Sequence, residues 1–125
     1  MNYKNTKENG VRNEAIRGAF NKGYRVSECG TKVQYRDRER KLQTVVTLGK
    51  PYHRFTVNHE GRTTNILVHR LQAYQKYKTK VFHPGIVVRH KNDNSLDNSK
   101  TNILIGTQKE NAKDRERNKR NNCPF

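Results

Sequence analysis

The sequence is poor in the residues that build a large hydrophobic core or a covalent framework. Hydrophobic residues make up 30% of its 125 positions, tryptophan is absent, and the mean hydropathy is -1.20. We therefore expect one domain with a thin core, or a core with arms that become ordered on a partner. The two cysteines, Cys29 and Cys123, form no Cys-x-x-Cys pair. Neither a disulfide framework nor a structural zinc site is expected.

Long apolar runs and acidic residues are also scarce. No run approaches the roughly 20 apolar residues that span a membrane, and the first ten residues contain no signal-peptide core. We expect a cytoplasmic protein that is not secreted and has no membrane partner. Lys and Arg total 27 against 11 Asp and Glu, a formal net charge of +16. This excess favours a polyanionic partner such as nucleic acid.

The pattern of residues predicts an α+β fold. Residues 1–23 are expected to form a polar arm (1–12) with a short helix over 13–20. Residues 24–66 alternate between β-favouring runs and Gly or Pro turns, which predicts an antiparallel β region. Given the excess of basic residues, we expect this region to bind nucleic acid, namely DNA. Apolar spacing over 67–77 indicates a helix. A strand–turn–strand–helix module then completes the region 67–120, and 121–125 is a tail.

The segment 87–111 brings together side chains that can hold a divalent ion and activate a water beside a phosphate. His90 ends a strand, and imidazole, with a reference pKa of about 6.5, can take a proton from water at neutral pH. Asn102 starts the returning strand, where its amide can bond across the turn and hold the two strands together. Asn111 lies in the first turns of a capped helix and presents a carbonyl oxygen, a hard ligand suited to Mg²⁺.

Several motifs, in this order, resemble the HNH nuclease family with its ββα-metal fold, and most closely the phage and intron homing-endonuclease branch. The matching segments are Val88-Arg89-His90-Lys91-Asn92, Asn98 to Asn102-Ile103, Thr107 to Asn111, and upstream Val68-His69-Arg70-Leu71. Tyr24 to Gly30 is similar to the start of the β-rich modules attached to such nucleases. The resemblance covers roughly residues 24–115.

The resemblance implies an endonuclease of phage or mobile-element type that nicks or cuts duplex DNA in the cytoplasm of a host cell. His90 would be the general base, Asn102 the structural asparagine, and Asn111 a ligand of a single Mg²⁺ or Mn²⁺. No zinc and no small-molecule cofactor is implied. His90 would take a proton from the water that attacks phosphorus, and the ion would stabilise the developing charge. The oligomeric state is not fixed by the sequence.

Basic residues expected to contact nucleic acid fall into three groups. They are Arg89 and Lys91 beside His90; Lys109, Lys113, Arg117 and Arg120 along the tail helix; and Arg36, Arg38 and Arg54 in the β region. The simpler interpretation of the tail stripe is a solvated helix face.

Arg89 leaves alternatives open. It occupies the position where many family members have an acidic second metal ligand, and arginine cannot ligate a cation. Phosphate oxygens and water would then complete the site, with Asp93 or His83 as candidate additions. A weak or inactive DNA-binding protein on the same scaffold is the first alternative, and a basic RNA-binding protein, favoured by charge alone, is the second. His90 as a packing histidine and Asn111 as a solvated residue are the corresponding simpler roles.

Overall fold

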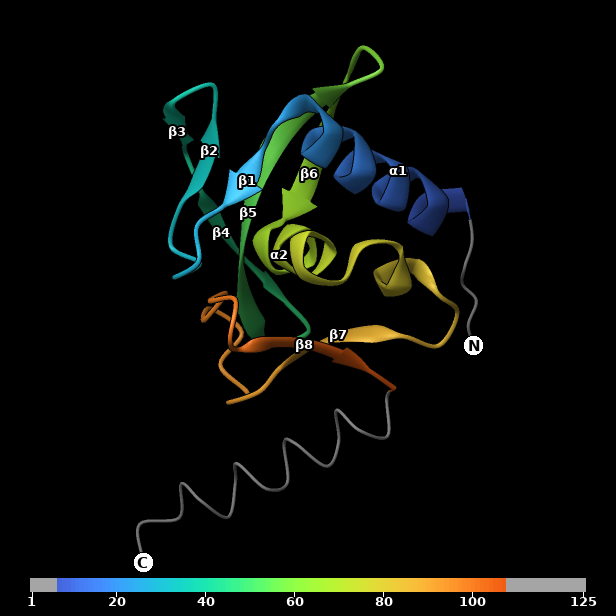
Figure 1. Ribbon diagram of the computed structural model, residues 1–125, viewed down its shortest axis with the longest axis vertical. Helices are drawn as coiled ribbons and strands as arrows, with labels where there is room; N and C mark the ends of the chain where they lie inside the picture. The colour runs from blue at the N-terminus through green and yellow to red at the C-terminus, as the bar shows by residue number, and fades with distance from the viewer. Residues whose placement is uncertain (1–6, 108–125) are drawn as a thin grey trace, which may run out of the picture.

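The computed structural model describes residues 7–107, with side chains from Arg12 onward. These residues form an α+β structure with three antiparallel sheets, which confirms the expected fold class (Figure 1). The elements are α1 (Lys7–Lys22), β1 (Arg25–Val26), β2 (Val33–Tyr35), β3 (Arg38–Arg40), β4 (Gln43–Thr47), β5 (Lys50–His59), β6 (Arg62–Leu67), α2 (Val68–Tyr77), the 3₁₀ helix η1 (Lys78–Phe82), β7 (Val87–His90) and β8 (Ile103–Gly106).

Helix α1 begins earlier than the sequence indicated. The polar arm expected through residue 12 is wrong for 7–12, because the helix already starts at Lys7. Ala15, Ile16 and Ala19 recur at helical spacing and are fully buried in the main core. Packing of this apolar face stabilises the whole helix, including its polar first turns. Helix propensity alone did not predict those turns.

Two of the sheets fill the region where β structure was expected. The first has the strand order β1-β2-β3 and the second has the order β4-β5-β6. Strands β3 and β6 were missed, because Arg-Glu-Arg and Arg-Thr-Thr-Asn contain almost no apolar signal. Phe55 of β5 lies opposite Ile66 of β6, and both side chains are buried in the core. Cross-strand pairing of this kind orders the polar strand.

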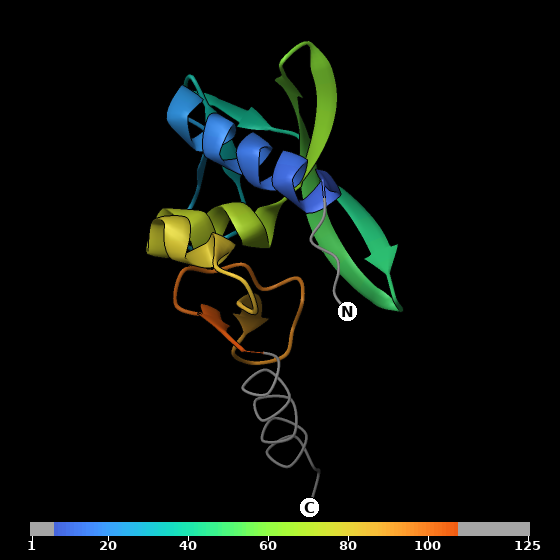
Figure 2. The ribbon, with the colours of Figure 1, turned by 90° about the vertical axis from the view of Figure 1, so that its right-hand side faces the viewer.

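Helix α2 lies between the β4–β5–β6 sheet and the β7–β8 hairpin (Figures 1 and 2). Leu71 and Tyr74 join the main core, whereas Ala73 packs with Val81 and Ile103 in a second, smaller core. One helix therefore supports both the sheet and the hairpin, and it fixes the hairpin relative to the rest of the domain.

Neither helix in residues 7–107 has the length and apolar character that a membrane span requires. The helix expected to start at Thr107, with its basic stripe, lies outside the described residues.

Candidate active site around His90

His90 is held at the rim of the hairpin by its strand partner. It is the last residue of β7 and lies opposite Ile103, the first residue of β8. Ile103 is fully buried in the core beneath α2, while His90 is half-buried. Cross-strand partners point to the same side of a sheet. The imidazole therefore faces α2 but stays accessible at the edge.

A hydrogen bond with Asn98 fixes the tautomer of His90. The His90 Nε2–H donates to Asn98 Oδ1, and the two atoms are 3.1 Å apart. With Nε2 protonated, the Nδ1 lone pair is left to accept a proton. Burial lowers the pKa of His90, and the bond to Asn98 and the charge of Asp97 only partly oppose this. His90 is therefore neutral at neutral pH, as a general base must be.

Asn98 is itself locked by two distant segments. Its backbone oxygen accepts a hydrogen bond from Gln72 Nε2 at 2.9 Å, and the same nitrogen donates to Ser27 O at 2.9 Å. Gly30 lies so close that a Cβ on it would be 2.1 Å from the carbonyl carbon of Asn98. The loop before β2 and helix α2 thus hold the partner of His90 from both sides.

Asn102 closes the loop that joins β7 to β8. Its Oδ1 accepts from the backbone N–H of Asn92 at 3.0 Å, and its Nδ2 donates to the backbone oxygen of Asp97 at 2.8 Å. The side chain is 7% exposed. Asn102 therefore lies where it can stabilise the loop that carries Asp93 and Asn98.

A second histidine packs against His90 from helix α2. The ring centroids of His69 and His90 are 5.2 Å apart, and those of His69 and Tyr52 are also 5.2 Å apart. Burial, and secondarily the charge of His90, lowers the pKa of His69 to about 3. Its Nδ1 is buried and has no hydrogen-bond partner among the described residues. His69 is therefore a neutral neighbour of His90.

These side chains surround a small polar hollow of about 70 Å³. It is lined by Lys50, Tyr52, His69, Val88, His90, Asp93 and Ser95. Lys50 Nζ is 3.5 Å from the carboxylate of Asp93, and Ser95 Oγ donates to the backbone oxygen of Pro51. We call this space the His90 hollow. It has room and polar partners for water.

Arg89 and Lys91 flank His90 but do not line the hollow. Because residues alternate along a strand, Arg89 points to the face opposite that of Val88 and His90. Its Nη1 donates to the backbone oxygen of Ile105 at 3.3 Å. Lys91 is exposed immediately after the strand. His83, named from sequence as an additional ligand, is exposed after η1 and does not line the hollow.

The predicted arginines of the β region do not share one sheet. Arg54 is on β5, whereas Arg36 and Arg38 are exposed on the turn and strand of the β1–β2–β3 sheet. The structure thus does not place these three arginines in one sheet. Asn111, Lys109, Lys113, Arg117 and Arg120 lie outside the described residues.

Sequence reasoning gave no role to Asn98, Gln72 or Gly30, and it assigned His69 a structural role between its helix and the sheet. Asn98, Gly30 and His69 lie in segments that resemble family motifs, whereas Gln72 lies outside them. The contacts that these four residues make had no signal in the sequence.

A possible metal cluster was also missed. Glu14, His59 and Glu60 present ligand atoms within 4.8 Å of one another. It involves the end of β5 away from Lys50, and ten strand residues span roughly 30 Å. The cluster is therefore separate from the His90 hollow.

No family model and no curated protein sequence matches the chain. A solved structure described as DNA binding and cleavage by the HNH homing endonuclease I-HmuI is similar, with 28% sequence identity and a TM-score of 0.55. The match covers 82% of this chain and 55% of that one, so the chain spans just over half the length of its structural neighbour. The chain therefore has an HNH-like fold.

Proposed function

We propose that this chain is a divalent-metal-dependent DNA endonuclease of the HNH type that nicks or cuts duplex DNA, in the phage or mobile-element homing branch. The observation that carries the proposal is the state of His90: a neutral, accessible imidazole whose Nε2–H is held by Asn98, on the hairpin of an HNH-like fold. Residues 67–120 would form the nuclease module and residues 24–66 a β-rich DNA-binding region.

In this mechanism His90 Nδ1 takes a proton from water as the water attacks phosphorus. Asn98 holds the ring and stabilises the imidazolium that forms, since its Oδ1 accepts from Nε2 in both protonation states. His69 remains neutral and adds no opposing charge. Asn102 keeps the loop closed, and Lys50 at the edge of the hollow is suited to a phosphate oxygen.

The donor atoms near His90 fit a hard divalent ion. Among the residues that line the hollow, Asp93 supplies a carboxylate and Ser95 supplies a hydroxyl. We propose Asp93, together with Asn111, as the residues that would hold Mg²⁺ or Mn²⁺. When bound, such an ion would supply Lewis-acid stabilisation of charge on the phosphate and the leaving oxygen.

The test is nicking of supercoiled plasmid by the full chain with Mg²⁺ or Mn²⁺. His90→Ala should lower the rate by about 10²- to 10⁴-fold, the usual contribution of a general base. Asn111→Ala should raise the concentration of metal ion needed for half-maximal rate. His83→Ala is the matched control, because this exposed histidine does not line the hollow. Nicking that survives His90→Ala would contradict the assignment of the base.

A non-catalytic DNA-binding protein is the second candidate, and Arg89 is the observation that favours it. Its guanidinium stands where an acidic ligand is usual and donates to the hairpin backbone. Binding of duplex DNA without cleavage, under every metal condition tried, would establish this alternative. A preference for structured RNA without cleavage would favour a basic RNA-binding protein instead.

A further inference from the structure

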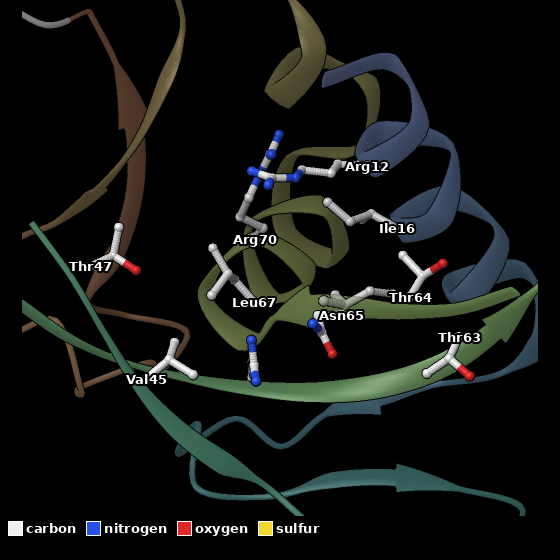
Figure 3. Close-up of a pocket in the computed structure, with 11 residues that line it drawn as sticks. Arg12, Ile16, Val45, Thr47, Thr63, Thr64, Asn65, Leu67 and Arg70 are labelled. Atoms are coloured by element: carbon white, nitrogen blue, oxygen red, sulfur yellow. The ribbon is translucent and has the colours of Figure 1, made fainter. Parts of the chain in front are cut away.

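A second and larger hollow lies where α1, α2 and the β4–β5–β6 sheet meet. Its volume is about 540 Å³, and Arg12, Arg54 and Arg70 line it from three different elements. Figure 3 shows Arg12 and Arg70 side by side at one end, with Asn65 and Leu67 below them. No described residue that lines it is acidic. We call this space the arginine groove.

Two of the three groove arginines are held by neutral acceptors. Arg70 Nη2 donates to Asn13 Oδ1 at 2.8 Å, and Arg54 Nε donates to Gln43 Oε1 at 3.2 Å. An amide oxygen orients a guanidinium but, unlike a carboxylate, leaves its full positive charge available. Burial, and then the charge of Arg12, lowers the pKa of Arg70. Positive charges therefore lie close together in a half-buried site, where they repel one another. An anionic ligand would offset this repulsion.

Hydroxyl and amide groups complete the lining. Thr47, Thr63, Thr64 and Asn65 add neutral hydrogen-bonding side chains along β4 and β6. Guanidinium groups surrounded by neutral hydrogen-bond donors suit a phosphate, because a phosphate accepts several hydrogen bonds at once.

Strand β5 connects the arginine groove to the His90 hollow. Lys50, Tyr52 and Arg54 alternate along it and so share one face, with successive members about 7 Å apart. Lys50 and Tyr52 line the His90 hollow, whereas Arg54 lines the groove. On the partner strand, Val45 and Thr47 of the groove lie directly opposite Tyr52 and Lys50. The two spaces therefore adjoin each other along β4 and β5.

We propose that the arginine groove binds a backbone phosphate of the same duplex DNA whose scissile phosphate reaches His90, with Arg12, Arg54 and Arg70 as its ligands. The inference rests on the proposed function, which supplies the DNA. It adds Arg12 and Arg70 to the contact surface and makes the groove a second anchoring point, displaced from the site of chemistry along β5.

The experiment measures the affinity of the full chain for a labelled DNA duplex over a range of salt concentrations. Arg12→Gln and Arg54→Gln should each weaken binding and reduce the log–log salt slope by about 0.9, the value for one lost phosphate contact. Arg12→Lys should restore most of the slope, because the charge is kept. Arg17→Gln is the matched control: it removes the same charge from the same helix, but Arg17 lies over the Phe82 ring outside the groove.

The outcomes separate this inference from the proposed function. Reduced slopes for both groove variants, with a much smaller change for Arg17→Gln, support the groove whether or not the wild-type chain nicks plasmid. If the log–log salt slope is the same for Arg12→Gln, Arg54→Gln and Arg17→Gln, the groove is not a phosphate site, even if nicking depends on His90. Failure of the wild-type chain to bind duplex DNA, or tighter binding of an RNA duplex through the same residues, also overturns it.

Discussion

The His90 hollow and the arginine groove are neighbours on β5 but differ in size, charge and support. The hollow is about 70 Å³ and contains two imidazoles that burial keeps neutral, whereas the groove is about 540 Å³ and collects three guanidinium groups. Asn98, the hydrogen-bond partner of His90, is held by a close backbone contact with Gly30, while amide acceptors orient two of the groove arginines. A small neutral space suits proton transfer, and a large cationic one suits the holding of a phosphate.

The largest expected effect comes from the backbone contact that supports the hollow. Gly30 has φ +77 and lies against the Asn98–Ser99 peptide, so Gly30→Ala adds both backbone strain and a steric clash. We expect it to lower the free energy of unfolding by about 3 kcal/mol or more. Urea denaturation followed by circular dichroism measures this.

Gly49→Ala is the matched control for that substitution. Gly49 has φ +79 in the β4–β5 turn beside the groove, but a Cβ there meets nothing within 4 Å. Strain alone should cost about 1 kcal/mol. If both variants lose the same stability, the close approach of Gly30 to Asn98 is not what supports the hollow.

The buried His69, which lines the hollow, should make the free energy of unfolding depend on pH. The pKa of His69 is about 3 in the folded protein and near its ordinary value of 6.5 when unfolded, so protons bind the unfolded chain first as pH falls. His69 therefore makes stability fall below pH 6.5, by up to about 1.4 kcal/mol per pH unit.

Thermal unfolding between pH 7 and pH 5 tests this, with His69→Phe as the comparison. The Phe variant should lose less stability over this range, with His90 accounting for part of the dependence that remains. An unchanged pH dependence in His69→Phe would show that the titrating group lies elsewhere.

The features that the sequence predicted are local ones, and the features that it did not predict depend on residues far apart in the chain. Apolar patterns along the sequence predict the α+β class, helix α2 and the two strands that flank the His90 loop. His90, Asn98 and Asn102 belong to one short segment, so a local motif was enough to bring them together. Neither Gln72, which bonds to Ser27 across 45 positions, nor the Arg70–Asn13 pair, 57 positions apart, has a local signal. Polar strands β3 and β6 were missed for the same reason, since packing of distant residues orders them.

A smaller effect should follow from a charge placed beside His90, the proposed base. Asn98→Asp puts a carboxylate against His90 Nε2, which stabilises the imidazolium and raises the pKa of His90. The acidic limb of kcat/KM for nicking should then move to higher pH, by about one unit or more. Asn94→Asp is the control, because it adds the same charge to the same loop while its Oδ1 serves the backbone N–H of Leu96. Equal shifts in the two variants would mean that the Asn98 contact does not tune the base.

The smallest expected effect concerns Lys50, which lies between the two spaces. Its ammonium pairs with Asp93 at 3.5 Å, but the two side chains are 41% and 39% exposed, so the pair is worth less than about 1 kcal/mol of folding free energy. Lys50→Gln should therefore leave the urea midpoint almost unchanged. Because the charge of Lys50 contributes to lowering the pKa of His90, the same variant should move the acidic limb of kcat/KM slightly upward, by less than Asn98→Asp does. A large loss of stability with no movement of that limb would instead make Lys50 a structural residue, and the edge of the hollow would then have no role in the chemistry.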